Sequence, residues 1–280
     1  MILAAPHGVL IVSGTGTGVG KTVTTAAIAA LAAARGERVA IVKPAQTGVP
    51  PEVREVAPSV DVSAPDEIAC DRARSRGERG VIPPEDTDVP DIDTVTRLSG
   101  VTDTRELARF PDPLSPEAAA RLSGIPPLDM HAAAEYVAKL ATERDLVLVE
   151  GAGGLLVRYD PAGTTIADLA VALAAPVLTV AAAGLGTLNH TMLTLEALSF
   201  RKIISAGVVI GSWPADPGLA ERANLADLSV VAGGPLAGIL PERAGKLARA
   251  AFLAAARTGL SARLGGQRPD FHNDSGVSVR

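Results

Sequence analysis

The sequence predicts an α/β fold with a mostly parallel central sheet covered by helices on both faces. Short apolar segments alternate with helix-like segments along much of the 280-residue chain. The apolar segments lack the alternation of apolar and polar residues that marks a half-exposed strand, which is typical of parallel strands buried on both faces. A glycine-rich segment between the first strand and the first helix adds a phosphate-binding signature.

The first elements form a βαβ unit. Residues 9–13 are expected to form a buried strand, residues 22–35 an alanine-rich helix, and residues 39–42 a second buried strand. Gly36 follows the helix, and glycine is favoured just past a helix C-terminus. This order of elements implies parallel strands joined by a right-handed crossover.

The same alternation resumes later in the chain. Further strands are expected at residues 146–149, 176–181, 207–210 and 236–240, and helices at residues 92–99, 188–200, 219–228 and 242–256. Together these elements predict a single domain over residues 1–263.

Two segments fall outside this pattern. Residues 49–90 are rich in proline and charged residues, and so long a structureless stretch inside a compact domain indicates an insertion. Residues 264–280 are polar and glycine-rich, and we expect a disordered tail there.

Composition and charge exclude several classes of protein. A net charge of −5 argues against a general nucleic-acid binder, and one cysteine excludes a disulfide framework. The cysteine, Cys70, lies in the proline-rich segment, and the four histidines lack metal-ligand spacing. No apolar run reaches the length of a membrane span, and no basic segment precedes the first apolar stretch. We therefore expect a cytoplasmic enzyme without a membrane anchor.

The loop after the first strand carries the clearest functional signal. It reads GTGTGVGKT from Gly14 to Thr22. Strict Walker A spacing would place its first glycine at Thr15, one residue later than Gly14. Glycines allow consecutive backbone N–H groups to face a phosphate, and the positive end of the following helix adds to their effect. Lys21 supplies a charge for the β- and γ-phosphates, and the Thr22 hydroxyl is placed for Mg²⁺. The fold is thus expected to be a three-layer P-loop NTPase.

Acidic residues are needed beside Thr22, because Mg²⁺ takes several oxygen ligands. Glu150 stands at the carboxyl end of the strand at residues 146–149, where open α/β sheets bind ligands. A Glu that only caps the next turn is the alternative. Asp88, Asp91 and Asp93 are further candidates near the start of a short helix, where Asp91 could instead act as an N-cap. The residues alone do not separate these three.

Four motifs in order resemble those of the dethiobiotin synthetase family. They are GTGTGVGKT at residues 14–22, KPAQTG at residues 43–48, EGAGGLL at residues 150–156 and GLGTLNH at residues 184–190. The family's P-loop also has its first glycine one residue early. The resemblance covers residues 9–260 apart from the proline-rich segment.

The resemblance implies a Mg²⁺-dependent ligase of biotin biosynthesis that uses ATP or another nucleoside triphosphate. Its substrates would be 7,8-diaminopelargonic acid and CO₂ or bicarbonate, joined through a carbamic-phosphoric anhydride to give dethiobiotin, a nucleoside diphosphate and phosphate. A homodimer with shared active sites is also implied. Proteins of the ParA/MinD kind, a related alternative, usually carry an extra lysine at the start of the P-loop, which is absent here. A module that binds a nucleotide without hydrolysing it remains a further alternative.

The resemblance also implies roles for individual residues. The implied catalytic residues are Lys43, Lys21 and Thr17, and the implied metal ligands are Thr22, Asp91 and Glu150; the family pattern thereby chooses Asp91 over its neighbours. Nucleotide contacts fall on Gly18, Val19, Gly20, Lys21, Thr22, Val23, Asp91, Glu150, Gly151, Ala152, Gly153, Gly211, Ser212, Pro241, Glu242 and Arg243. Substrate contacts fall on Thr47, Ala152 and Gly153 and, from the partner subunit, on Leu185, Gly186, Thr187, Leu188 and Asn189.

One position departs from the family pattern. Many members place an Asn at the end of the strand that precedes Gly211, where its side chain reads the adenine edge. Gly211 has no such side chain. The sequence therefore predicts relaxed selectivity for the nucleotide base.

Overall fold

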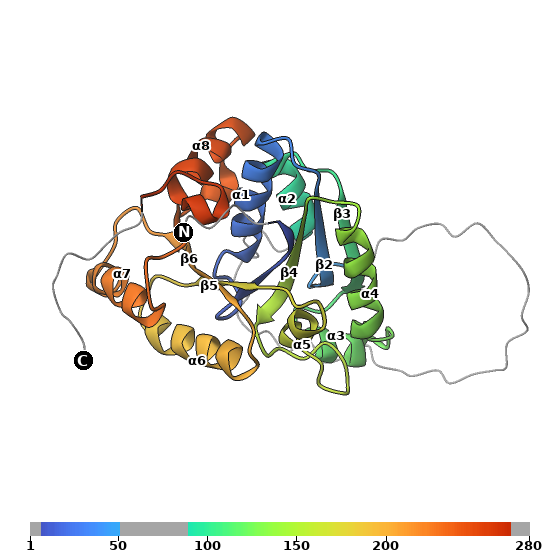
Figure 1. Ribbon diagram of the computed structural model, residues 1–280. Coiled ribbons are helices and arrows are strands. Elements are labelled where there is room, and N and C mark those ends of the chain that lie inside the picture. Colours follow the sequence, from blue (N-terminus) through green and yellow to red (C-terminus); the bar gives the residue numbers. More distant parts are fainter. Residues whose placement is uncertain (1–6, 51–88, 270–280) are drawn as a thin grey trace, which may run out of the picture.

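The computed structural model describes residues 7–50 and 89–269. Within these ranges, seven strands form one sheet in the order β3-β2-β4-β1-β5-β6-β7, and every neighbouring pair is parallel (Figure 1). The strands are β1 (Gly8–Gly14), β2 (Val39–Thr47), β3 (Thr104–Phe110), β4 (Leu146–Gly154), β5 (Val177–Ala181), β6 (Ser205–Trp213) and β7 (Gly238–Pro241). The predicted α/β class is confirmed, with a sheet that is wholly rather than mostly parallel.

Helices cover both faces of this sheet, because alternate side chains of each buried strand point to opposite sides. The helices are α1 (Lys21–Ala34), α2 (Asp91–Ser99), α3 (Pro116–Ser123), α4 (Met130–Ala141), α5 (Ile166–Ala172), α6 (Thr187–Phe200), α7 (Leu219–Val231) and α8 (Arg249–Gly259), with short 3₁₀ turns at Ala244–Lys246 and Ala262–Leu264. Helices α1, α2 and α8 pack on one face around Leu10 and Val12. Helices α3 to α7 pack on the other, against Ile11, Val149 and Val208.

The alanine-rich helix α1 sits at the centre of the first face. Its alanines at positions 26, 27, 29, 30 and 32 are all buried. Small side chains let the helix approach the sheet closely, and this fixes the start of α1 relative to the end of β1. The P-loop between them is thereby held on the central strand of the sheet.

Three expectations need correction or extension. The closing helix does not span residues 242–256, because Arg243 adopts a left-handed backbone (φ 57°) and a 3₁₀ turn precedes α8, which begins at Arg249. Residues 264–269 of the expected tail belong to the folded unit, since Leu264 is buried and Ser261 bridges to Arg268. Residues 51–88 of the predicted insertion and residues 270–280 of the predicted tail lie outside the described residues.

Four further elements were not expected at all, namely β3, α3, α4 and α5. Strand β3 lies at the edge of the sheet and carries the ion pair between Glu106 and Arg109, so it lacks an apolar run. Among the helices of the described ranges, none combines the length and apolar character that crossing a bilayer requires.

Candidate active site

The carboxyl ends of β1, β2 and β4 meet at one edge of the sheet, as the parallel arrangement requires. The P-loop leaves β1 there and enters α1 through Gly20, whose left-handed backbone (φ 94°) places it at the N-cap. The first backbone N–H groups of α1 therefore face the edge without a partner inside the helix, which creates an anion site.

Strand β6 supports the P-loop from behind. A Cβ atom built on Gly211 would lie 2.1 Å from the Val19 carbonyl oxygen and 3.1 Å from Gly20 Cα. No side chain fits in this space, so the glycine allows β6 to contact the loop directly. Gly211 is thus buried under the P-loop, within the strand rather than at its end.

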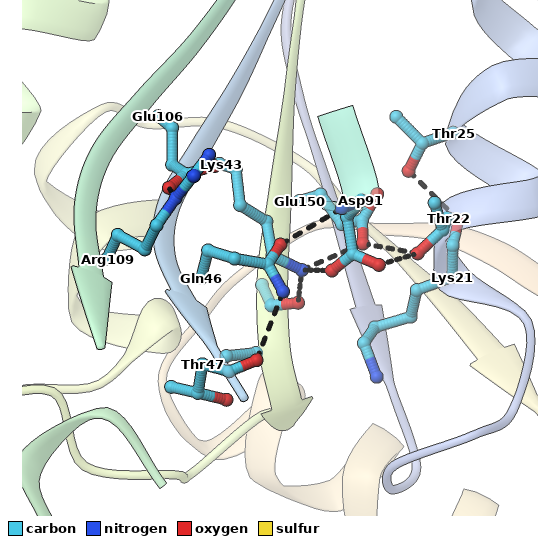
Figure 2. Close-up of polar contacts among 12 residues, drawn as sticks. Lys21, Thr22, Thr25, Lys43, Gln46, Thr47, Asp91, Glu106, Arg109 and Glu150 are labelled. Carbon is cyan, nitrogen blue, oxygen red and sulfur yellow. Dashed lines mark hydrogen bonds and ion pairs between the residues drawn. The ribbon is translucent and has the colours of Figure 1, made fainter. Parts of the chain in front are cut away.

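The P-loop lysine lies folded back on its own loop. Lys21 Nζ donates a hydrogen bond to the Gly16 carbonyl at 2.8 Å, and in Figure 2 the side chain points away from the nearby carboxylates. Burial, together with the positive charge of Lys43, lowers the pKa of Lys21 to about 8. A bound phosphate would offset both effects by supplying negative charge.

Four side chains from separate parts of the chain form a compact charge cluster (Figure 2). Lys43 Nζ lies 2.6 Å from Asp91 Oδ2 and 2.9 Å from Glu150 Oε1. The Thr22 hydroxyl lies 2.9 Å from Asp91 Oδ1 and 2.9 Å from Glu150 Oε1. Both acidic residues predicted as ligands are therefore beside the P-loop threonine, and neither is merely a cap.

Of the three candidate aspartates, the structure describes Asp91 and Asp93. Asp91 is the first residue of α2, and its carboxylate faces Thr22 and Lys43 instead of capping the helix. Asp93 is exposed, and Asp88 lies outside the described residues. The Gln46 side chain accepts a hydrogen bond from the Asp91 backbone N–H at 3.1 Å, and this contact ties the start of α2 to the end of β2.

The opposite charges in this cluster offset the effect of burial on the pKa values of Lys43 and Asp91. Burial alone would lower the pKa of Lys43, but the carboxylates of Glu150 and Asp91 outweigh it and hold the pKa above the ordinary lysine value. Burial would raise the pKa of Asp91, and the Lys43 ammonium reverses this shift and holds it below the ordinary value. The Lys43 ammonium and the Asp91 carboxylate thus remain charged in the buried site.

The donor set fits a magnesium ion. One hydroxyl and two carboxylates converge within hydrogen-bonding distance, and Mg²⁺ usually binds through one or two carboxylates together with substrate phosphates. In the described ranges, no group of three or more His, Cys, Asp or Glu residues could hold a metal by itself. A metal at this site would therefore depend on Thr22, Asp91, Glu150 and the nucleotide.

A cavity of about 620 Å³ opens over the cluster. Half of the predicted site residues line it: Thr17, Gly18, Gly20, Lys21, Thr22, Val23, Lys43, Thr47, Asp91, Glu150, Ala152 and Gly153. Sequence reasoning missed a second wall, which consists of Gln46, the turn at residues 113–116, and Val157. The turn has a local signal, since Pro113 and Pro116 are its first and last residues and α3 begins at Pro116.

Other predicted residues do not line this cavity within the described part of the chain. Leu185, Gly186, Thr187, Leu188 and Asn189 lie at the start of α6. Gly211 and Ser212 lie within β6, and Pro241, Glu242 and Arg243 lie at the end of β7 and just after it. Val19 and Gly151 are buried, and neither of them lines the cavity. Thr187 donates to the Ala182 carbonyl at 2.7 Å, so its hydroxyl stabilises the local turn.

The sequence of this chain matches known proteins over most of its length. Residues 8–246 match a family model described as an AAA domain. The chain is 55% identical over 257 residues to the ATP-dependent dethiobiotin synthetase BioD of Frankia casuarinae, and covers 93% of that protein. It is 53% identical over 258 residues to the protein of the same name from Streptomyces avermitilis, and covers 94% of it. Each match spans 92% of this chain.

Solved structures also resemble this chain at low sequence identity. The cell division ATPase MinD of Pyrococcus furiosus is 17% identical with a TM-score of 0.49, over 92% of this chain and 97% of that one. A ParA family ATPase of Chlorobium tepidum is 15% identical with a TM-score of 0.49, over 94% and 96%. The relatives of more than 50% identity, which are matched over nearly their whole length, decide the assignment. The chain belongs to the dethiobiotin synthetase family.

Proposed function

We propose that this chain is an ATP-dependent dethiobiotin synthetase, a ligase of biotin biosynthesis. It joins CO₂ to 7,8-diaminopelargonic acid and closes the ureido ring of dethiobiotin, while ATP is converted to ADP and phosphate. The observation that carries this proposal is the buried Lys43 ammonium beside two carboxylates and the P-loop, in one cavity. The identity of more than half of the residues to named dethiobiotin synthetases supports it.

The proposed reaction has two bond-forming steps. One amine of the substrate takes up CO₂ as a carbamate and loses a proton. A carbamate oxygen then attacks the γ-phosphorus, the bond to the β-phosphate oxygen breaks, and ADP leaves. The second amine attacks the carbonyl carbon of the resulting anhydride and loses a proton, the bond from this carbon to the phosphate oxygen breaks, and phosphate leaves as the ring closes. No covalent bond to the protein is required.

Positive charge is the protein's main contribution, since both reacting groups are anions. Lys21 and the backbone N–H groups of the P-loop would hold the phosphates, and Lys43 would bind between the carbamate and the γ-phosphate. Each charged hydrogen bond contributes about 1.5–3 kcal/mol. Alignment of the carbamate with the γ-phosphate contributes up to about 7–11 kcal/mol more.

The same residues support a role for Mg²⁺. Thr22, Asp91 and Glu150 would hold it beside the phosphates, as their converging oxygens indicate. When bound, Mg²⁺ neutralises charge on the β- and γ-phosphates. Lys43 now contacts both carboxylates, so its ammonium would turn toward the substrate once they are engaged.

A homodimer with shared sites is also part of the proposal. The N–H groups at the start of α6, near Leu185 to Asn189, would bind the substrate carboxylate in the site of the partner subunit. This helix exposes the apolar side chains of Met192, Leu193 and Phe200 (86% exposed), and Leu185 (94% exposed) lies just before the helix. Exposed apolar patches of this kind mark interaction surfaces.

We further propose that the enzyme discriminates weakly between nucleotide bases. Gly211 is packed against the P-loop and can present no amide side chain to a base edge. Competition of CTP and GTP against ATP in the complete reaction tests this feature. Comparable kcat/KM values for the three nucleotides are expected, and a strong preference for ATP would contradict the proposal.

Phosphate release tests the activity itself. Purified protein with Mg²⁺, ATP, bicarbonate and 7,8-diaminopelargonate should release phosphate and form dethiobiotin in equal amounts. Omission of the diamine should abolish both. Phosphate release that is unchanged without the diamine would refute the synthetase and favour a nucleotide-driven switch, whereas ATP binding without any release would indicate a binding module. The single cysteine, which leaves no disulfide framework, supports a cytoplasmic location for this reaction.

A further inference from the structure

We propose that Tyr159 is a positioning residue, which acts through the backbone N–H of Ala152 to hold the cavity wall at residues 151–153. This inference rests on the proposed function, because that wall borders the space assigned to the diamine. Tyr159 lies outside the four motifs of the family resemblance and does not line the cavity in the described residues.

An irregularity in the sheet creates the need for such a residue. Val12 of β1 pairs with Glu150 of β4, and the next pair is Gly14 with Gly154. Three residues of β4, at positions 151–153, therefore lie opposite Ser13 alone. Residues in a bulge leave the regular ladder, and their backbone groups must find other partners.

Tyr159 supplies one of these partners. Its hydroxyl oxygen accepts a hydrogen bond from the Ala152 N–H at 2.7 Å. The side chain is fully buried, and its ring belongs to the apolar cluster on the second face of the sheet. Burial raises the pKa of this phenol above its ordinary value, so the hydroxyl stays neutral.

The position of Tyr159 is itself fixed by a short loop. Its backbone N–H donates to the Thr164 carbonyl at 2.8 Å, and the adjacent Arg158 bridges to Thr165. Asp160 accepts a hydrogen bond from the Thr164 N–H at 2.9 Å, which closes the same loop. A buried ring on a closed loop is a rigid support for the wall.

The wall that Tyr159 holds lies next to the reacting groups. Ala152 and Gly153 line the cavity, and the Gly151 carbonyl oxygen is 3.4 Å from Lys43 Nζ. Gly153 has a left-handed backbone (φ 65°), so the chain turns sharply at this point. Loss of the Tyr159 hydroxyl would allow the Ala152 amide to rotate, and it would displace the wall beside Lys43.

The variant Tyr159→Phe tests this inference, because it removes the hydroxyl and keeps the buried ring. We expect KM for 7,8-diaminopelargonate to rise about tenfold, as a buried N–H loses its acceptor. The affinity for ATP should change less than threefold, since the P-loop on β1 and α1 holds the phosphates. Tyr136→Phe is the matched control: Tyr136 is the other tyrosine of the sequence, and its hydroxyl accepts from Arg105 Nε at 3.1 Å on the surface.

A second measurement tests the hydrogen bond between the Ala152 N–H and the Tyr159 hydroxyl without measuring activity. With ¹⁵N-alanine labelling, hydrogen exchange of the Ala152 amide should be at least tenfold faster in Tyr159→Phe than in the unmodified protein. The amide of Ala40, which is buried in β2, should be unaffected. Faster exchange together with the higher KM would support the proposal.

The remaining outcomes each contradict it in a distinguishable way. Unchanged exchange at Ala152 would show that Tyr159 does not hold this amide. Faster exchange with an unchanged KM would reduce Tyr159 to a structural contact and overturn its positioning role. An unmodified protein without diamine-dependent turnover would refute the proposed function, and the positioning role with it.

Discussion

Lys43 remains charged inside the protein because two carboxylates replace its lost hydration. The residue is 4% exposed, and Asp91 and Glu150 lie within 2.9 Å of its ammonium. Removal of one partner from such a buried group leaves an uncompensated charge, at a cost of about 3–5 kcal/mol. The buried ion pairs thus make the fold sensitive to the loss of one partner. They also provide a cation at the point where two anionic substrates would meet.

Lys43→Ala should therefore separate chemistry from nucleotide binding. We expect kcat for dethiobiotin formation to fall at least a hundredfold, while the Kd for ATP changes only a few-fold, because Lys21 and the P-loop remain. Turnover and calorimetric titration measure the two quantities, with Lys139→Ala on the exposed face of α4 as the control. Equal losses of binding and turnover would make Lys43 a binding residue instead.

The phenol of Tyr159 predicts a specific pH dependence of stability. Its pKa is raised by burial, so the folded state retains a proton that the unfolded state releases near pH 10. Its contribution is fully present below pH 10 and is lost as the pH rises further, by up to about 1.4 kcal/mol per pH unit. Urea unfolding at pH 9 and pH 10.5 should show a shrinking advantage of the unmodified protein over Tyr159→Phe. A constant difference would contradict the burial of this phenol.

At the scale of helices and strands, the sequence predicts those elements that have a clear local pattern of residues. Apolar runs predicted β1, β4 and β5, and the glycine-rich motif predicted the loop before α1. Strand β3 was not predicted, because it lies at the edge of the sheet and carries charged residues in place of an apolar run. The cavity wall formed by Gln46 and the turn at residues 113–116 was not predicted either, because it forms only when β2 and α3 pack together. Such a wall depends on contacts between residues that are far apart in the sequence, and no local sequence pattern predicts these contacts.

The contact of β6 with the P-loop is one such long-range feature. Gly211→Ala should destabilise the protein by about 1–3 kcal/mol and weaken ATP binding, because the added Cβ would overlap the Val19 carbonyl. Gly234→Ala is a suitable control, since a Cβ there meets no atom within 4 Å. Thermal unfolding and ATP titration measure both effects. An unchanged Gly211→Ala protein would show that the P-loop is not supported by β6.

At the scale of the whole molecule, the proposed dimer decides whether one chain holds a complete site. The cavity brings together the P-loop, Lys43 and the two acids, whereas the start of α6 does not line it in the described residues. The substrate carboxylate would therefore need a second copy of the chain, docked through the exposed apolar surface of α6.

Complementation between two inactive variants tests this arrangement. Lys43→Ala removes the cation of one subunit, and Asn189→Asp adds a negative charge where the partner would bind the carboxylate. A mixed dimer should contain one intact site out of two, so a random equal mixture should regain about a quarter of the activity. Activity equal to the sum of the separate variants would show that sites are not shared.

Transfer of oxygen from carbamate to phosphate tests the central claim most directly. Reaction of ATP and 7,8-diaminopelargonate with freshly added ¹⁸O-labelled CO₂, quenched before the label exchanges with water, should yield inorganic phosphate that carries one ¹⁸O atom. This result follows because the attacking carbamate oxygen leaves with the phosphate when the ring closes. Phosphate without label, formed at the same rate as dethiobiotin, would contradict the anhydride and the role assigned to the Lys43 cluster.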